Sequence, residues 1–220
     1  QSTAVQWTVA SGGNGHWYRA IVVPAGINWE SARDSARTIG GDMVSLETPT
    51  EQEFCFEKFS RTSAPEAWTY QGSPLIFGPW IGGYQLPGST EPSGGWYWLS
   101  GQPFDPTRPP GCCNNACEGS AEEDRLHLYY NTTDGVSETT WNDLPSVVTC
   151  GNQIISFVIE YSADCNADGI VDYGQILSGE LIDANSNGIP DICEVDPCPG
   201  DISGNGAVDG VDLSVLLGVW

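Results

Sequence analysis

The sequence predicts an α+β fold over residues 1–161, followed by a small acidic segment over residues 162–220. Three observations carry this prediction. Two stretches with helical periodicity come early, short apolar stretches between glycine and proline turns follow them, and the last 60 residues repeat an Asp/Asn-rich pattern. Helices followed by short strands are typical of an α+β domain with an antiparallel sheet.

Both helices are predicted from their start and stop signals. Asn28 can cap a first helix whose apolar residues recur at helical spacing from Trp29 to Ile39, and the glycine pair at 40–41 ends it. A second helix begins at Thr48 or Thr50. The sequence Thr-Glu-Gln-Glu at 50–53 forms a capping box that places acidic side chains in the first helical turn.

Short strands are predicted from apolar runs bounded by turn residues. A first strand, Met43–Leu46, separates the two helices. Four more follow after residue 75, at 80–84, 96–99, 126–130 and 154–161.

The net charge of −22 is divided equally between two unequal parts of the chain. Residues 1–160 contain 18 acidic and all 7 basic side chains, whereas residues 161–220 contain 11 acidic side chains and no basic one. Phosphate backbones and anionic lipid surfaces repel such a chain, so we expect no nucleic-acid partner. The sequence has no run of 18 apolar residues, so we expect no membrane insertion. Nine tryptophans argue against disorder.

Eight cysteines favour an oxidising, extracellular compartment. Five precede residue 161 and three follow it, so if all are paired, at least one bridge joins the two segments or two molecules. A zinc site is disfavoured because there are only two histidines, His16 and His127. The chain starts at Gln1, which is expected of a secreted protein whose signal peptide has been removed, and equally of a trimmed chain.

A series of motifs in the first segment resembles the C-type lectin domain. In the family's order they are Gly15–Tyr18, Trp29–Arg33, Gly40–Leu46, Thr50–Glu53, Trp80–Gly83, Gly95–Gly101, Glu123–Asp124, Trp141–Asp143 and Phe157–Glu160. The Trp-Ile-Gly sequence at 80–82 matches the family's central motif. The resemblance implies the C-type lectin-like fold, with two helices, antiparallel strands and a long loop region.

The same resemblance places a calcium and sugar site between residues 101 and 143. In sugar-binding members, carboxylate and amide oxygens hold one Ca²⁺, whose open positions accept two sugar hydroxyls. By resemblance Glu123, Asn142 and Asp143 occupy three ligand positions, and Asn114 matches the loop asparagine. These four residues are therefore expected to bind Ca²⁺ and a glycan.

The loop that contains Asn114 departs from the family's pattern. Cys112 stands where a carboxylate is usual, and a vicinal Cys112–Cys113 disulfide is a hypothesis for the kinked turn that a cis-proline normally supplies. The alternative is a loop pinned by disulfides that binds no ligand.

Other residues have expected roles outside this site. Ala36 and Ile159 stand where the family's long disulfide would be, so we expect them to pack together, and Arg125 replaces another half-cystine. The tryptophans and both histidines are expected to be structural. Asn131 begins the only N-glycosylation sequon.

The C-terminal segment contains three copies of one loop pattern, which start 19 and 18 residues apart. Oxygen-bearing side chains occupy loop positions 1, 3, 5 and 9, and a glycine occupies position 6. The positions are Asp164, Asn166, Asp168 and Asp172 in the first copy; Asp183, Asn185, Asn187 and Asp191 in the second; and Asp201, Ser203, Asn205 and Asp209 in the third. This pattern wraps a backbone around one Ca²⁺.

Position 12 distinguishes the copies. The second copy has Glu194 and the third Asp212, whereas the first has Gln175 and is expected to bind most weakly. The alternative is a linker rich in Asx turns whose acids are merely solvated. The first two copies resemble thrombospondin type 3 repeats, and the third resembles half of a dockerin module. This second resemblance implies a cohesin-like partner, although the usual pair of loop–helix units is incomplete.

These observations predict a secreted, calcium-dependent, carbohydrate-binding protein with a calcium-stabilised C-terminal docking segment. The alternative is a structural subunit of an extracellular fibre or surface layer, self-associated through that segment. We expect no enzymatic activity, because no nucleophile–base pair or paired acids stand at motif spacing.

Overall fold

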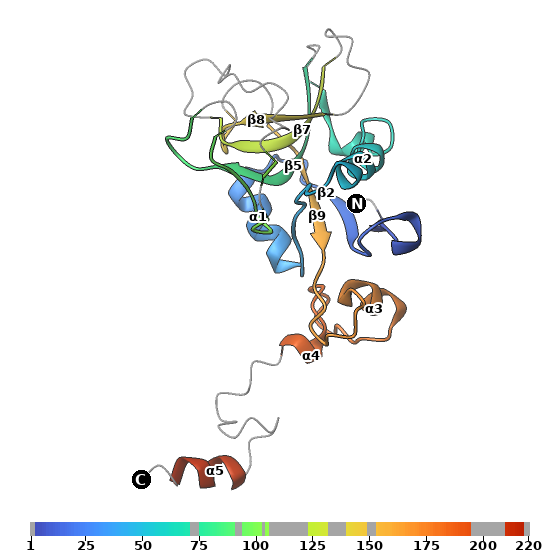
Figure 1. The fold of residues 1–220 in the computed structure, drawn as a ribbon, viewed down its shortest axis with the longest axis vertical. Helices are drawn as coiled ribbons and strands as arrows, with labels where there is room; N and C mark the ends of the chain where they lie inside the picture. The colour runs from blue at the N-terminus through green and yellow to red at the C-terminus, as the bar shows by residue number, and fades with distance from the viewer. Residues whose placement is uncertain are drawn as a thin grey trace.

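A computed structural model of the chain describes residues 3–70, 75–90, 94–102, 104–105, 123–131, 140–148, 153–194 and 210–217 (Figure 1). Its strands are β1 (Val5–Gln6), β2 (Trp17–Val22), β3 (Asp42–Met43), β4 (Thr69–Tyr70), β5 (Leu75–Gln85), β6 (Trp96–Trp98), β7 (Arg125–Asn131), β8 (Thr140–Leu144) and β9 (Ser156–Tyr161). Its helices are α1 (Trp29–Thr38), α2 (Pro49–Lys58), α3 (Asp172–Ser178), α4 (Asp191–Glu194) and α5 (Gly210–Leu217), with 3-10 turns at Val9–Ser11 and Pro65–Ala67. None of the helices within these ranges has the length and apolarity needed to cross a membrane.

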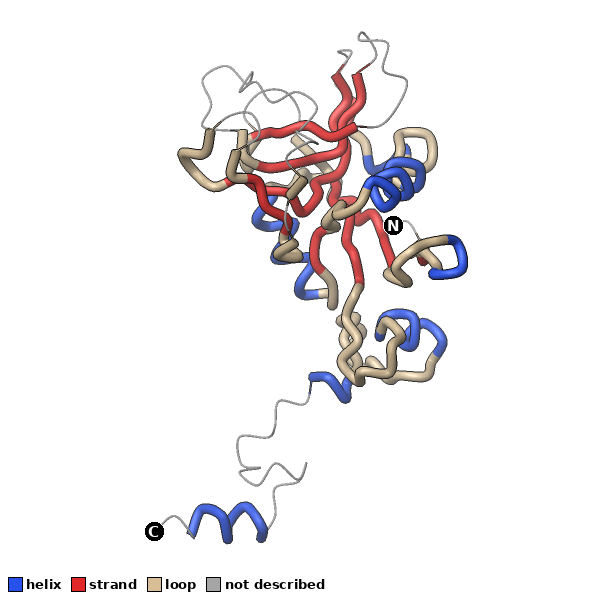
Figure 2. The backbone as a smooth tube through the Cα atoms, in the orientation of Figure 1, coloured by secondary structure: helices blue, strands red, loops and turns tan. Residues whose placement is uncertain are grey.

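The strands form one mixed sheet, in the order β1-β2-β9-β5-β7-β8, with β3 paired to β9 and β4 and β6 paired to β5 (Figure 2). The pairs are antiparallel except for β5 and β9, which meet in parallel at Trp80 and Phe157. The α+β class is therefore confirmed, while the expected antiparallel sheet has one parallel pair at its centre. That pair depends on the chain path between β5 and β9, which local sequence patterns do not encode.

Strand lengths differ from the predicted ones where tertiary pairing extends or ends them. Strand β5 covers 75–85 rather than 80–84, because its first residues pair with the end of β7. The strand predicted at 43–46 is reduced to β3 at 42–43. Strand β2 was missed, although Tyr18 and Ala20 alternate with less buried residues along it.

The first helix begins as predicted, and the second is capped by Thr48, the earlier of its two predicted caps and two residues before the predicted capping box. Asn28 Oδ1 accepts a hydrogen bond from the Ser31 amide at 2.7 Å. In α2 the cap is Thr48, whose hydroxyl accepts from the Glu51 amide at 3.1 Å, and Pro49 occupies the first turn. The box predicted at Thr50–Glu53 is therefore wrong, because a proline is best accommodated in the first turn of a helix.

The sheet has a hydrophobic core on each face, and α1 and α2 lie on either side of the β2–β9 pair (Figure 1). Alternation along β9 divides its side chains between the two cores. Val158 packs in the core that includes Cys55, in the last turn of α2, and Phe59, which follows that helix. Phe157 and Ile159 pack in the other core, with Trp29 of α1. Both faces of β9 are thus covered, which explains its continuous apolar sequence.

The residues that replace the expected long disulfide are both fully buried in the α1-side core. Ala36 and Ile159 belong to the same hydrophobic cluster, in agreement with the expectation that packing replaces the disulfide here. Arg125 instead pairs with Glu30 of α1 at 2.9 Å and lies over the Trp29 ring at 4.8 Å. An ion pair and a cation–π contact therefore join β7 to α1.

Candidate metal centres and lectin-like site

The first loop of the C-terminal segment closes around the side chain of its first residue. Asp164 accepts hydrogen bonds from the Asp168 amide at 3.1 Å and the Gly169 amide at 2.9 Å. Asn166 Oδ1 also accepts from the Asp168 amide, and Asp168 accepts from the Ile170 amide at 2.8 Å. This last bond is the main cause of the lowered pKa of Asp168. Side chains at positions 1, 3 and 5 thus turn towards one loop interior.

Positions 9 and 12 close the first loop from the side of α3. Asp172 accepts from the Cys165 amide at 2.9 Å, and burial raises the pKa of its carboxyl. Gln175 donates from Nε2 to Asp168 at 2.7 Å. The predicted ligands of this copy are therefore brought together, with an amide where a calcium loop normally has a carboxylate.

The second loop repeats the hydrogen bonds that the backbone amides of the first loop donate, whereas its bonds at position 12 differ. Asp183 accepts from the Asn187 amide at 3.1 Å and the Gly188 amide at 2.8 Å, and Asp191 accepts from the Ala184 amide at 2.9 Å. Glu194 accepts from the side-chain amides of Asn185, at 3.0 and 3.1 Å, and of Asn187. All five side-chain ligands predicted for this copy are therefore within one hydrogen-bonded cluster.

The chemistry and backbone of both loops fit Ca²⁺. The side chains supply hard oxygen donors at positions 1, 3, 5, 9 and 12. The glycines at position 6 have left-handed φ angles, +86° at Gly169 and +81° at Gly188. Ala167 and Ser186, at position 4, are also left-handed, with φ of +58° and +59°. Loop closure imposes that conformation on residues that normally avoid it, and the sequence reasoning missed it.

The third copy lies mostly outside the described residues. Asp201, Ser203, Asn205 and Asp209 fall there, whereas Asp212 lies in the first turn of α5 and is buried. The third loop therefore stays a prediction from the sequence.

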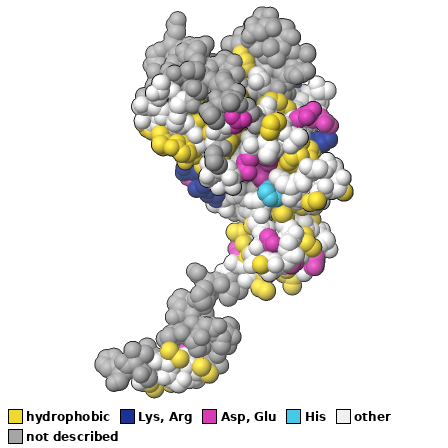
Figure 3. Space-filling model, viewed as in Figure 1, with side chains coloured by type: hydrophobic (Ala, Val, Ile, Leu, Met, Phe, Trp, Pro, Cys, Tyr) yellow, Lys and Arg dark blue, Asp and Glu magenta, His cyan; other side chains and the backbone are white. Residues whose placement is uncertain are grey.

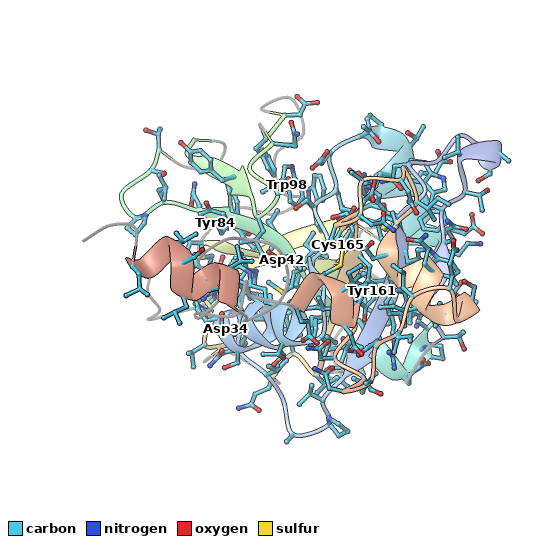
Figure 4. The ribbon with its side chains drawn as sticks, turned by 90° about the horizontal axis from the view of Figure 1, so that it is seen from below. Asp34, Asp42, Tyr84, Trp98, Tyr161 and Cys165 are labelled. Atoms are coloured by element: carbon cyan, nitrogen blue, oxygen red, sulfur yellow. A yellow bond between two sulfur atoms is a disulfide. The ribbon has the colours of Figure 1, made fainter. Side chains whose placement is uncertain are left out.

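A disulfide joins the first two loops to each other. Cys165, at position 2 of the first loop, is bonded to Cys193, at position 11 of the second, and Figure 4 shows this bond next to the start of the segment. Cys55 is a buried free thiol, so the eight cysteines are not all paired. Cys112, Cys113, Cys117, Cys150 and Cys198 lie outside the described residues, as does the hypothesis of a vicinal bridge.

The two loops also pack against the described part of residues 3–161, which we call the head, a contact that the sequence did not reveal. The ring of Tyr173, on α3, stacks on that of Tyr161, at the end of β9, with centroids 3.7 Å apart and planes 11° apart. Trp17 of β2 meets Tyr173 edge-on at 6.1 Å. These three aromatic rings form a small hydrophobic joint between the head and the loops.

A pair of glycines makes a second, closer contact at this joint. A Cβ atom on Gly188 would lie 2.3 Å from the carbonyl oxygen of Ile39, and one on Gly40 would lie 2.3 Å from that of Gly188. The backbones can approach this closely only because neither residue has a side chain. The glycine at loop position 6 therefore serves both the loop and the joint.

Three of the four predicted lectin-site residues lie at the adjoining ends of β7 and β8. Asn142 and Asp143 are on β8, opposite His127 and Leu126, and Glu123 lies two residues before β7. Glu123, Asn142 and Asp143 are all buried. Asn114 falls outside the described residues, so its place relative to these three stays a prediction.

His127 orients the amide of Asn142. Its Nε2 lies 3.1 Å from Asn142 Nδ2, and its ring is enclosed by Phe77, Trp80 and Tyr129. Burial lowers the pKa of His127 to about 3, so the ring is neutral and Nε2 accepts the hydrogen bond. The amide oxygen of Asn142 is thereby directed away from His127, which is the arrangement a metal ligand needs. The histidine is packed, as predicted, and it also has this positioning role.

The sequon residue Asn131 is the last residue of β7 and pairs with Leu75 of β5. Thr132 and Thr133, which complete the sequon, lie outside the described residues.

A second group of buried polar side chains, on the α2 side of the head, was not predicted. Tyr18 donates to Glu51 at 2.7 Å, and His16 lies 2.6 Å from Glu160. Burial, followed by the charge of Glu160, raises the pKa of Glu51 to about 7. Burial lowers the pKa of His16, but its hydrogen bond to Glu160 and that group's charge outweigh this and raise it overall. The motifs that contain these residues do not signal the cluster, because it forms only where the start of β2, helix α2 and strand β9 meet.

No protein-family model matches the sequence, and no curated protein matches it either. Among solved structures, the chain is similar to the cow C-type carbohydrate-recognition domain of CD23, crystallised with an oligosaccharide, at 22% identity, 69% coverage of this chain, 91% of that one, and a TM-score of 0.43. Human lithostathine is 18% identical, with 68% of this chain and 85% of that chain covered and a TM-score of 0.44. Herring type II antifreeze protein is 20% identical, with 69% of this chain and 94% of that chain covered and a TM-score of 0.43. C-type lectin domains are thus among the structural neighbours.

Proposed function

We propose that the chain is a secreted calcium-binding protein whose lectin-like head binds glycans and whose C-terminal loops are folded by Ca²⁺. The observation that carries the calcium part is the repeated arrangement of the first two loops, in which five oxygen-bearing positions converge with identical backbone hydrogen bonds. The same closure in both copies supports a common ligand over independent solvation of the surface acids.

When bound, Ca²⁺ would supply charge compensation rather than catalysis. Residues 162–194 contain seven acidic side chains and no basic one, so the loops repel themselves. Asp164, Asp168 and Asp172 would hold one ion, and Asp183, Asp191 and Glu194 the other, with the asparagine oxygens completing each set. Each site combines negative charge with a left-handed glycine turn, as calcium loops require.

The glycan part of the proposal rests on the residues at the β7 and β8 ends. Glu123, Asn142 and Asp143 bring two carboxylates and one oriented amide to adjoining strands, which suits a hard cation with open positions. Because these three residues resemble the family's Ca²⁺ ligands, we expect sugar hydroxyls to occupy the open coordination positions of the ion.

A glycan array probed with the full chain, in Ca²⁺ and in chelator, tests this function. We expect binding only in Ca²⁺, lost in Asp143→Asn and retained in Asp183→Asn, which removes a ligand from the second C-terminal loop. Calorimetric calcium titration of the same proteins reports the loops separately. An array without signal in Ca²⁺, from protein whose loops bind the ion, would contradict the glycan part and leave the calcium part standing.

A second candidate function is a structural subunit that assembles with copies of itself. The specific observation in its favour is α5, whose aliphatic side chains are exposed. Exposed apolar groups on a short terminal helix favour an intermolecular contact.

A further inference from the structure

The joint between the head and the first two C-terminal loops contacts each loop at a different position. In the first loop the contact is Tyr173, at position 10, whose ring stacks on that of Tyr161 of β9. In the second loop it is Gly188, at position 6, whose backbone lies against Gly40 and the carbonyl of Ile39. Both contacts therefore involve the residue that directly follows a predicted calcium ligand. Figure 3 shows the two loops as a lobe in direct contact with the head.

A carboxylate of the first loop is buried at the joint. Asp172, at position 9, is 2% exposed and lines a pocket of about 360 Å³ together with Tyr161 of the head. Its Oδ2 accepts the hydrogen bond from the Cys165 amide, whereas its Oδ1 has no hydrogen-bond partner among the described residues. Arg37, which lines the same pocket, is paired with Asp42 at 2.8 Å. Because burial of an unpartnered carboxylate oxygen costs free energy, closure of the joint is unfavourable unless a cation compensates Asp172.

The contact at the second loop fixes the turn from which its ligands project. The Gly188 amide donates to Asp183, at position 1, at 2.8 Å, and the preceding residue, Asn187 at position 5, accepts from the Ile189 amide at 2.9 Å. A displacement of the Gly188 backbone therefore disturbs ligand positions 1 and 5 together. The first loop lacks this restraint, because a Cβ on Gly169, the equivalent glycine, would meet no described atom within 4 Å.

We propose that Gly40 and Tyr161 of the head are positioning residues for the two calcium sites, so that Ca²⁺ binding and closure of the joint are one coupled equilibrium. Bound Ca²⁺ compensates the buried carboxylate and favours the closed joint. The closed joint in turn holds the ligand-bearing turn of the second loop and favours Ca²⁺, because such a coupling is reciprocal. Without the ion the joint opens, and Ser162 and Ala163 are then the connection between head and loops. This inference deepens the calcium part of the proposed function and rests on it.

Calcium titration of the ¹⁵N-labelled full chain, followed at the amide resonances of Gly169 and Gly188, reports each loop separately. A Cβ on Gly40 would lie 2.3 Å from the carbonyl oxygen of Gly188, so we expect Gly40→Ala to raise the calcium concentration at the Gly188 midpoint at least about fivefold. Gly12→Ala is the matched control, because its φ of +86° is close to the +82° of Gly40 but no described atom lies within 4 Å of its added Cβ. It should leave both midpoints unchanged.

Tyr161→Ala tests the contact with the first loop and does not depend on backbone strain. It should raise the midpoint at Gly169 by a similar factor, and Tyr161→Phe, which keeps the stacked ring, should restore most of the affinity. The amides of Val158 and Leu128 are followed in the same spectra. They should keep their chemical shifts, which shows that the head of each variant stays folded while the calcium affinity changes.

The outcomes distinguish the coupling from the calcium sites themselves. If both loop glycines respond to Ca²⁺ but Gly40→Ala and Tyr161→Ala leave the midpoints unchanged, the coupling is overturned and the calcium part of the proposed function stands. Equal changes in Gly12→Ala and Gly40→Ala would also overturn it, because general destabilisation of the head would then set the affinity. No response of either loop glycine in the unsubstituted chain would overturn the calcium part, and the coupling with it.

Discussion

The head and the first two C-terminal loops are held together by different forces. The head buries large side chains on both faces of its sheet, among them Trp29, Trp80 and Phe157. In the loops, the aliphatic residues Ile170, Leu177, Ile182 and Ile192 are exposed, and the buried side chains include the polar Asp172 and Gln175. The head is therefore stabilised by hydrophobic burial, and the loops by hydrogen bonds, one disulfide and a small joint to the head.

This difference teaches how a short acidic segment acquires a structure. Small units without a sufficient core depend on cross-links or metal ions for their folding free energy. Cys165–Cys193 fixes the loops covalently, and their converging oxygens would hold the proposed Ca²⁺. The predictions that follow separate these contributions from those of the head.

Removal of Ca²⁺ should have the largest effect and should be confined to the loops. Without the ion, the seven acids of residues 162–194 repel one another, so α3 and both loops should open. Hydrogen exchange measures this: the amides of Gly169 and Gly188 should lose protection in chelator, whereas those of Val158 and Leu128 keep it. Equal loss in both regions would show that the head depends on the metal as well.

Substitution of the glycine at the joint should cost the next largest amount. Gly188→Ala combines a left-handed φ with a Cβ that clashes with the carbonyl of Ile39, so we expect a loss of about 2–4 kcal/mol in unfolding free energy. Gly179→Ala is the matched control, because its φ is +78° but nothing lies within 4 Å of the added Cβ. It should cost only about 1 kcal/mol. Thermal unfolding in Ca²⁺ compares them, and equal losses would mean that the joint contributes nothing.

The two loops should differ in calcium affinity because of position 12. Glu194→Gln should weaken the second site by roughly tenfold, and Gln175→Glu should strengthen the first by a similar factor, since charged ligands raise affinity. In Gln175→Glu the hydrogen bond to Asp168 is also replaced by repulsion, which the ion relieves. Calorimetry with each single variant assigns the sites. Unchanged isotherms would favour the solvated-linker alternative.

The last expected effect is a pH dependence confined to the head. The pKa of Glu51 is raised to about 7 in the folded state, so its favourable contribution is present at low pH and is lost as pH rises from about 4.5 through 7. The raised pKa of His16 changes the stability of the head with pH in the same direction. Glu51→Gln should therefore stabilise the head at pH 8 relative to wild type, by on the order of 2 kcal/mol, and not at pH 5. Thermal unfolding at both pH values tests this, and a pH-independent difference would contradict it.

The elements that the sequence predicted correctly have signals within a few residues. Asn28 and the glycine pair fix α1 because capping and chain reversal are local, and the backbone turns of the first two C-terminal loops follow from their positions 1 to 12 for the same reason. Errors arose where local signals competed. Thr48 and Thr50 both suit a cap, and only the placement of Pro49 in the first turn decides between them.

By itself, the sequence determined the α+β class and the turns of the first two C-terminal loops, because periodicity, caps and turns are local properties of the chain, and it predicts the residues that we propose as Ca²⁺ ligands. Only the tertiary structure decided that Tyr173 stacks on Tyr161, that Gly188 meets Gly40, and that His127 orients Asn142. It also decided the parallel β5–β9 pair. These contacts join residues far apart in the chain, and long-range packing leaves no periodic or motif signal in a single sequence.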